Sequence, residues 1–492
     1  MKMPNKIFSF FSGKFKTNLF KNSFWGIFSN VFQNILFSIF FIVLARQYST
    51  EDFANYIIAN TLYSFVVGFS SLGLGHWFVR ELLHTEDRAS LTDKFFKTQL
   101  YIGVIFYAVN IILAYSLYTS PLVRNLSLLI GINVIFDNII YVIRFINVAE
   151  FEQKKTFIIL IVEAVLKFLI ACVLFVYPIP IIYLSVLLII LRLITLNLFI
   201  RIGSSNTIHI RQILKVKVSW KEIKEMIGSN WSFVVIGSIS VVYWRIGNIL
   251  ISKILTLADV ANYEVSYKLF SMAEILPVIV STTIYPTLIN SLKEGGNKLS
   301  DIYNKAFIGY SLFGLLAFTF VFSFSDWLIP LLFGAKYVGT ALYCKEMFLT
   351  ILIFPTAVFQ ANILLTLKLE KLDMWCNIAS LVINIALCFI GLHFIKSLSV
   401  INYAIFFSFI VFHAVQDIVL IKRKITTVQK VLAFYITCFA LVAFYYFMSL
   451  KINGMYLFFI FWFIIGGIGA IYFIKNKNDF FPKSIPVDTA EH

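Results

Sequence analysis

Two pentapeptides, Asp52-Phe-Ala-Asn-Tyr56 and Asp259-Val-Ala-Asn-Tyr263, are identical at four of five positions and lie 207 residues apart. Each follows a long apolar run, and their flanks also align. Leu44-Ala-Arg46 matches Ile251-Ser-Lys253 upstream, and Leu62 and Ser64 match Leu269 and Ser271 downstream. Two similar segments in the same context indicate an internal repeat.

The apolar runs beside the repeat are typical of the whole chain. Of its 492 residues, 60% are hydrophobic and only 13% are charged. Soluble domains average roughly 45–50% apolar and about 25% charged residues. Because so few polar groups could not cover a surface in water, we predict an all-α integral membrane protein. The net charge of +16 therefore bears first on orientation in the membrane, and we expect no nucleic-acid partner.

A membrane-spanning helix needs about 20 mostly apolar residues, and we predict about fourteen such helices. They lie near residues 24–44, 54–78, 97–118, 125–147, 157–177, 180–200, 229–251, 265–289, 306–325, 346–366, 374–394, 398–421, 431–449 and 455–474. A count of 12 or 13 is the alternative, because the fourth and eighth windows carry charges or prolines. Pro277 and Pro286 in the eighth window predict a bend.

The distribution of Lys and Arg predicts which side each loop faces. With the N-terminus on the cytoplasmic side, 30 of the 41 Lys and Arg residues fall on that side. Eight fall on the opposite side, and Lys167, Arg192 and Arg245 lie deep within spans. This imbalance is the positive-inside pattern, so we expect both termini in the cytoplasm.

Six predicted spans separate the two repeat copies, so both copies have the same orientation in the membrane. We therefore predict two parallel six-helix lobes around a central cavity, followed by two extra C-terminal helices. The expected divisions are an N-terminal lobe (1–201), a basic cytoplasmic linker (202–228), a C-terminal lobe (229–421), and the extra helices with a cytoplasmic tail (422–492). The linker is either an amphipathic helix on anionic lipid or a solvated segment.

Further segments accompany the repeat in a fixed order. They are Leu44-Ala-Arg46, Gly73-Leu-Gly75 ahead of Arg80, Arg245, Tyr285-Pro286 and Asp326-Trp-Leu-Ile-Pro-Leu-Leu-Phe-Gly-Ala-Lys-Tyr337. Together with the repeat they cover most of the chain. In this order they resemble the polysaccharide-transporter branch of the multidrug/oligosaccharidyl-lipid/polysaccharide (MOP) flippase superfamily, and within it the O-antigen (Wzx-type) flippases.

The resemblance implies a multi-pass protein of the bacterial inner membrane. Its substrate would be an undecaprenyl-pyrophosphate-linked oligosaccharide, such as an O-antigen unit of lipopolysaccharide, moved to the periplasmic leaflet by alternating access. Implied partners are that lipid-linked oligosaccharide, membrane lipids, and a polysaccharide polymerase with chain-length proteins. The alternatives are a flippase for a lipid-linked peptidoglycan or teichoic acid precursor, and a drug or cation exporter of the same superfamily.

Charged side chains within the predicted spans are the candidate site, because such groups usually face a cavity or a partner. Lys167, Arg192, Arg245 and Lys268 outnumber the acids Asp137, Glu163 and Glu274. This basic excess favours an anionic substrate over a cation. Arg binds phosphate oxygens in a bidentate manner and stays protonated, which suits a pyrophosphate.

We expect Arg245 and Lys268 to hold the pyrophosphate, with Lys167 and Arg192 as further substrate-binding residues. Trp244 and Tyr243, next to Arg245, are candidates for stacking on sugar. The alternative for Arg245 is a structural ion pair with an acid on a neighbouring span.

The three acids Glu163, Glu274 and Asp137 are candidates for ion coupling. For Glu163 the alternative is a pair with Lys167, four residues later on the same helical face. Arg192 either shares Glu163 or faces the cavity, and Glu274 either couples ions or pairs with Lys268. Arg144 lies close enough to the inner surface to extend toward it.

Other classes of protein find little support in the sequence. The five cysteines form no C-x-x-C pair, so we expect no metal site or cofactor. The sequence contains no nucleotide-binding loop or G-x-S-x-G motif, and the outer loops are short. We therefore expect no catalytic residues and no enzyme activity.

Overall fold

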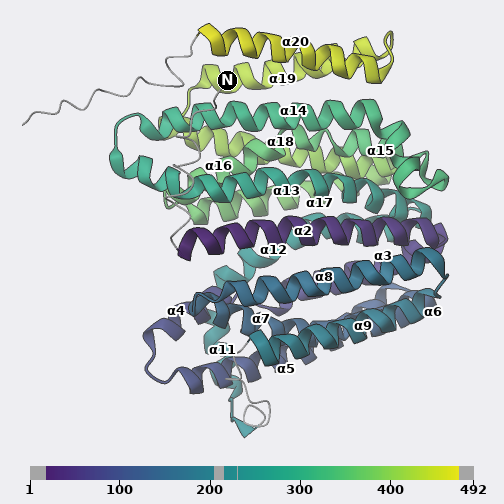
Figure 1. Cartoon of the computed structure of the whole chain (residues 1–492), viewed down its shortest axis with the longest axis vertical. Coiled ribbons are helices and arrows are strands. Elements are labelled where there is room, and N and C mark those ends of the chain that lie inside the picture. Colours follow the sequence, from purple (N-terminus) through teal and green to yellow (C-terminus); the bar gives the residue numbers. More distant parts are fainter. Residues whose placement is uncertain (1–17, 204–214, 230, 476–492) are drawn as a thin grey trace, which may run out of the picture.

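The computed structural model describes residues 18–203, 215–229 and 231–475, and every element in these ranges is helical (Figure 1). Lys2, Lys6, Lys14, Lys16, Arg211, Lys477 and Lys483, which support the predicted orientation, lie outside the described residues. Long apolar segments form helices because a helix satisfies its own backbone N–H and C=O groups, as hydrocarbon surroundings require.

The first half of the chain forms one group of helices, purple to blue in Figure 1. Its helix α2 packs on α8, and α3 packs on α5 and α6. The elements are α2 (Asn18–Gln47), α3 (Thr50–Ser70), α4 (Gly75–His84), α5 (Arg88–Leu117), α6 (Pro121–Gly131), α7 (Asn133–Ala149), α8 (Gln153–Val176), α9 (Ile181–Leu198) and the π-helix η1 (Phe199–Gly203).

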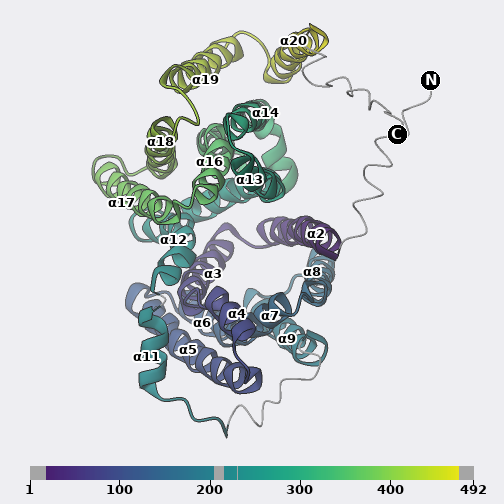
Figure 2. The same ribbon diagram turned by 90° about the vertical axis from the view of Figure 1, so that its left-hand side faces the viewer.

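The second half forms a second group, in which α13 packs on α14, α15 and α16, and α17 packs on α18. Its elements are α12 (Trp231–Ile254), α13 (Leu257–Glu294), α14 (Lys298–Phe333), η2 (Ala335–Tyr337), α15 (Thr340–Met347), η3 (Thr350–Leu352), α16 (Phe354–Thr366), α17 (Glu370–Phe394) and α18 (Leu398–Lys422). Figure 2 shows the two groups meeting along α2, α3, α12 and α13.

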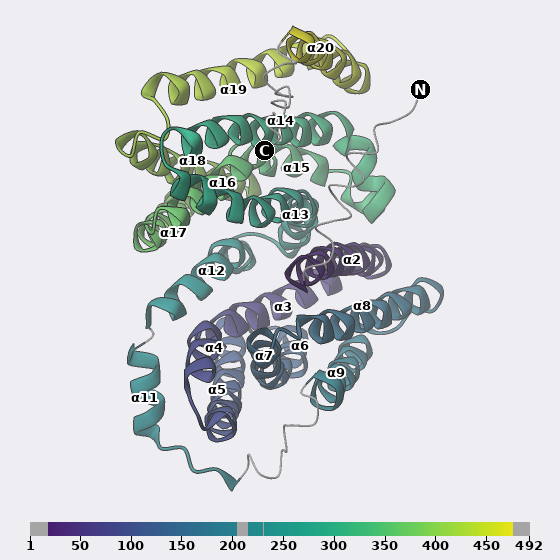
Figure 3. The ribbon, with the colours of Figure 1, turned by 60° about the vertical axis from the view of Figure 1, so that its left-hand side comes forward.

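Two further helices, α19 (Val428–Ser449) and α20 (Gly454–Lys475), lie at the edge of the second group, with α20 against α14 (Figures 2 and 3). Helix α11 (Trp220–Ser229), part of the predicted linker, lies beside α5. It is held there by an ion pair between Lys94 and Glu222 (3.1 Å), and Ile223 on it is buried. Part of the apolar face of α11 is therefore buried against the protein.

The repeated pentapeptide has the same structural role in both halves. Ser49 caps α3, and its hydroxyl accepts a hydrogen bond from the Asp52 backbone N–H (3.0 Å). Thr256 caps α13 in the same way with Asp259 (3.2 Å) and completes a capping box. In both copies the aspartate stands at the third helical position, where a carboxylate can bind back to the cap. The repeat thus begins two equivalent helices, and these helices pack against each other.

Each of the fourteen predicted windows falls mainly in helices. In the described residues, eleven segments are long and apolar enough to cross a membrane. The helices of the other three windows are α3, α12 and α20, and their crossing of the membrane stays a prediction, as do the cytoplasmic termini.

Three windows predicted as single helices are broken, so their continuity was predicted wrongly. The window 54–78 contains a turn between α3 and α4, where Leu72 (φ 50°) and Gly73 (φ 58°) have left-handed backbone. There Gly75 lets Phe145 approach so closely that a Cβ would lie 2.3 Å from its ring. The window 125–147 divides at Ile132, and 346–366 divides into α15, η3 and α16. Helix α13, by contrast, continues through Pro277 and Pro286.

Several hydrogen bonds join the halves at the end predicted to face outside. Arg46 donates to the Leu331 carbonyl (2.9 Å), and Lys336 donates to the Tyr48 carbonyl. The Tyr118 and Ser252 hydroxyls are 2.7 Å apart, which joins the α5 end to α12. These hydrogen bonds hold the two halves together at this end.

Close packing at Gly314 of α14 gives a testable prediction. A Cβ there would lie 2.6 Å from the Ile351 carbonyl oxygen, a backbone atom that cannot rotate away. Gly314→Ala should lower the free energy of unfolding by about 1–3 kcal/mol, as overpacking usually does. Gly309→Ala, on the same helix with open space around it, is the matched control. Thermal unfolding in detergent measures both, and equal shifts would contradict the packing.

Candidate functional site

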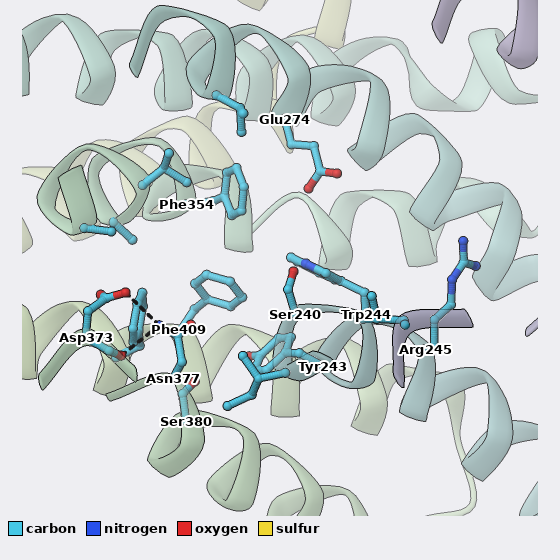
Figure 4. A pocket seen from close by; sticks show the side chains of 18 of the residues that line it. Ser240, Tyr243, Trp244, Arg245, Glu274, Phe354, Asp373, Asn377, Ser380 and Phe409 are labelled. Atoms are coloured by element: carbon cyan, nitrogen blue, oxygen red, sulfur yellow. Dashed lines mark hydrogen bonds between the residues drawn. The ribbon is translucent and has the colours of Figure 1, made fainter. Parts of the chain in front are cut away.

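Two cavities lie between the halves of the molecule. The first, which we call the basic chamber, has a volume of about 580 Å³. Its charged lining residues are Arg144, Glu163, Lys167, Arg192, Arg245, Glu264 and Lys268, with amides from Asn30, Gln33, Asn60 and Asn133. The second, which we call the aromatic chamber, has a volume of about 810 Å³ (Figure 4). Tyr63, Arg245 and Tyr267 line both chambers, so the two meet at these residues.

Arg192 of α9 is the centre of an ion-pair network in the basic chamber. Its Nε donates to Asp137 of α7 (2.8 Å), and its Nη1 donates to Glu163 of α8 (2.6 Å). Glu163 also pairs with Lys167 (2.9 Å), and the Tyr63 hydroxyl donates to Asp137. The network contains two cations and two carboxylates and is therefore electrically balanced. Sequence reasoning anticipated both pairs of Glu163 but not the Asp137–Arg192 pair.

Arg245 of α12 forms an ion pair with an acid on a neighbouring helix, which was the alternative to a role in substrate binding. Its Nη1 lies 3.1 Å from Oε1 of Glu264 on α13, and Asn248 donates to the other carboxylate oxygen (2.6 Å). The guanidinium also lies 5.5 Å from the centre of the Tyr267 ring. Sequence reasoning missed Glu264, because the predicted span began at residue 265 whereas α13 begins at Leu257.

Two cations of the basic chamber have no acidic partner in the part of the chain that the structure describes. The Lys268 ammonium lies 5.7 Å from the Phe41 ring and forms no hydrogen bond or ion pair. Arg144 likewise forms none, and it lines the basic chamber, although we expected it to extend to the inner surface. Since the other charges are paired, these two residues leave an excess of two positive charges.

The aromatic chamber combines ring faces with carboxylates. Trp244 lies near Tyr267 (5.5 Å between ring centres) and Phe409 (5.6 Å), and the Tyr243 hydroxyl is bonded to Ser408. Figure 4 shows Glu274 pointing from α13 into this chamber, and its carboxylate forms no ion pair with Lys268. The two predicted sugar-contact residues thus line the aromatic chamber, and Arg245, which follows them on α12, lies where the two chambers meet.

Groups of His, Cys, Asp and Glu that could hold a metal ion are not found among the described residues. The geometry offers paired and unpaired charges around enclosed space, which suits the binding and release of a polar molecule. An all-helical membrane protein with two repeated halves around polar chambers has the architecture of a transporter.

A family model described as "Polysaccharide biosynthesis protein" matches residues 43–342, and the chain belongs to this family. Solved structures confirm the expected superfamily fold. Lipid II flippase MurJ in its inward closed conformation is 15% identical, with a TM-score of 0.65, covering 91% of this chain and 98% of that chain.

Two other similar structures are transporters. The MATE multidrug transporter DinF-BH is 14% identical (TM-score 0.58; 82% of this chain and 95% of that chain). A MOP superfamily transporter from Pyrococcus furiosus is 12% identical (TM-score 0.53; 82% and 95%). No curated protein matches the sequence. The family and the fold are those of multi-pass membrane transporters of the MOP flippase type rather than of enzymes.

Proposed function

We propose that this protein moves an undecaprenyl-pyrophosphate-linked oligosaccharide, such as an O-antigen unit, from the cytoplasmic to the periplasmic leaflet of the bacterial inner membrane. The observation that carries the proposal is the excess of two positive charges in the basic chamber, from Arg144 and Lys268. A pyrophosphate diester carries two negative charges and so matches this excess.

The basic chamber suits a pyrophosphate in its geometry as well as its charge. Arg245 offers a planar fork of donors, and the ammonium of Lys268 forms no ion pair with a carboxylate of the described residues. Moving the anion across about 30 Å of hydrocarbon without such groups would be prohibitive. Lys167 and Arg192 supply further positive charge, although Glu163 and Asp137 hold them in ion pairs.

Transport requires the chambers to communicate with each leaflet in turn. In the present conformation the contacts of Arg46 and Lys336 join the two halves at the end predicted to face outside. We infer that these contacts separate when the lipid-linked sugar is released, as alternating access requires. A polysaccharide polymerase with its chain-length proteins would then consume the product.

Ion coupling through the predicted acids has different requirements at each site. Asp137 and Glu163 both pair with Arg192, so coupling through either acid would require that network to open. Glu274 forms no hydrogen bond or ion pair with the residues that the structure describes. It is the acid most accessible to a coupling ion or to substrate.

A second candidate is a flippase for a lipid-linked peptidoglycan precursor. The similarity in fold to lipid II flippase MurJ favours it, because that match covers 91% of this chain. Both candidates share the pyrophosphate chemistry proposed for the basic chamber, so they differ in the group that the pyrophosphate carries.

The Arg144→Gln/Lys268→Gln variant tests the proposal. Neither residue has an acidic partner among the described residues, so the change leaves no buried carboxylate unpaired and should preserve folding. We expect cells that carry it in place of the wild-type protein to accumulate lipid-linked oligosaccharide on the cytoplasmic leaflet. Export of the glycan should fall at least about tenfold, because charged hydrogen bonds are worth roughly 1.5–3 kcal/mol each.

The matched control is Lys293→Gln, an exposed lysine on the same helix as Lys268 but outside the chambers. It should leave export unchanged. Normal export by the double variant at normal membrane levels would overturn the proposal.

A further inference from the structure

We propose that the aromatic chamber is the sugar subsite, and that Glu274 and Asp373 restrict it to sugars that are neutral or carry an amino group. A uronic acid next to the pyrophosphate would be excluded. The inference rests on the proposed function, since it takes the pyrophosphate to lie in the basic chamber.

The junction of the chambers orders the parts of the substrate. Both cavities are lined by Tyr63, Arg245 and Tyr267. A pyrophosphate held by Arg245 therefore places the sugar attached to it at the entrance of the aromatic chamber. The first sugar is the group covalently attached to the pyrophosphate. It therefore enters the aromatic chamber before the rest of the glycan.

The lining of the aromatic chamber suits a sugar ring. Trp244, Phe354 and Phe409 present apolar ring faces, against which the C–H face of a pyranose can stack (Figure 4). Hydroxyls and amides stand between these rings and can bond to sugar hydroxyls. They come from Ser64, Ser240, Ser380, Asn362 and Asn377.

The charge of this chamber is opposite to that of the basic chamber. Glu274 has no partner among the described residues, and Asp373 accepts side-chain hydrogen bonds from the neutral amides of Asn377 (3.2 Å) and Gln416 (3.3 Å). Among the described residues that line the aromatic chamber, Arg245 is the cation, and it is already paired with Glu264. Two acidic side chains thus face the space, and neither forms an ion pair with the described residues.

This negative field acts as a filter. A uronate would bring a third carboxylate into a cavity that is poorly screened, and like charges there repel strongly. Sugar hydroxyls, in contrast, donate well to carboxylates, and an ammonium on an amino sugar is attracted. Specificity in proteins often depends on such repulsive elements as much as on new contacts.

The test measures binding by the full-length protein in nanodiscs, without an ion gradient, so that ion coupling does not contribute. The probes are undecaprenyl-pyrophosphate lipids that carry N-acetylglucosamine, glucosamine or glucuronic acid. Wild type should bind the glucuronic acid lipid at least about tenfold more weakly than the other two. Glu274→Gln should reduce this ratio, and Glu274→Gln/Asp373→Asn should bring it below about threefold.

Glu370→Gln is the matched control, because Glu370 is exposed and lies on the same helix as Asp373. It should keep the full discrimination. Equal binding of all three lipids by wild type would overturn the inference and leave the proposed function intact. Binding of a lipophilic dye cation such as ethidium, but of no pyrophosphate lipid, would instead overturn the proposed function itself.

Discussion

Replacing Arg245 by alanine should lower the transport rate by roughly 10- to 150-fold, the equivalent of about 1.5–3 kcal/mol for the loss of a charged hydrogen bond to phosphate. Arg245 lies where the two chambers meet, so in the proposed mode of binding it would contact the substrate at the link between pyrophosphate and sugar. Flipping of a labelled lipid-linked oligosaccharide by purified protein in liposomes measures the effect.

The ion pair of Arg245 with Glu264 supplies the decisive control. Arg245→Ala leaves Glu264 buried without its partner, which by itself destabilises the fold. Arg245→Ala/Glu264→Gln removes both charges and should recover much of the stability but none of the transport. If the double variant transports like wild type, Arg245 has only a structural role.

The second large effect is expected on stability, from Arg192. Its side chain is 20% exposed, whereas Glu163 is 3% and Asp137 11% exposed. Arg192→Gln leaves two nearly buried carboxylates without their main counter-charge. Removing one member of a buried ion pair costs about 3–5 kcal/mol, and we expect a loss of this size in the free energy of unfolding.

Thermal unfolding in detergent measures the loss. Arg192→Gln/Asp137→Asn/Glu163→Gln, which neutralises the acids together with the arginine, should return the unfolding temperature toward that of wild type. Lys167→Gln is the comparison at the edge of the network, because Lys167 is 26% exposed and Arg192 still neutralises Glu163. An equal loss for Lys167→Gln and Arg192→Gln would contradict the central role of Arg192.

The helical membrane fold follows from the sequence because hydrocarbon surroundings leave few alternatives to a helix of about 20 residues. Helix breaks were harder to predict. The turn at Leu72 and Gly73 lies in the Ser- and Gly-rich stretch Ser70-Ser-Leu-Gly-Leu-Gly75, a turn signal that a count of apolar windows alone passes over. The start of α13 was placed too late, because its first two turns carry the polar residues of the repeat.

Most charged residues of the candidate site were predictable, and so were the two pairs of Glu163, but not the other pairings between helices. Charges within spans are few, so each is conspicuous, and Arg192, Lys167 and Glu163 indeed lie together. Partners on different helices, such as Asp137 with Arg192, depend on packing that spacing along the chain does not specify. Asp373 was missed because it precedes its predicted span by one residue, although it lines the aromatic chamber.

The most direct test of pyrophosphate-dependent transport compares two lipids in the same proteoliposomes. One is an undecaprenyl-pyrophosphate oligosaccharide, and the other is the same oligosaccharide attached to undecaprenol without phosphate. A membrane-impermeant lectin reports how much of each lipid reaches the outer leaflet. We predict that wild type moves the pyrophosphate lipid at least about tenfold faster, and that Arg144→Gln/Lys268→Gln abolishes this preference. Equal movement of the two lipids by wild type would contradict the proposal that transport depends on the pyrophosphate.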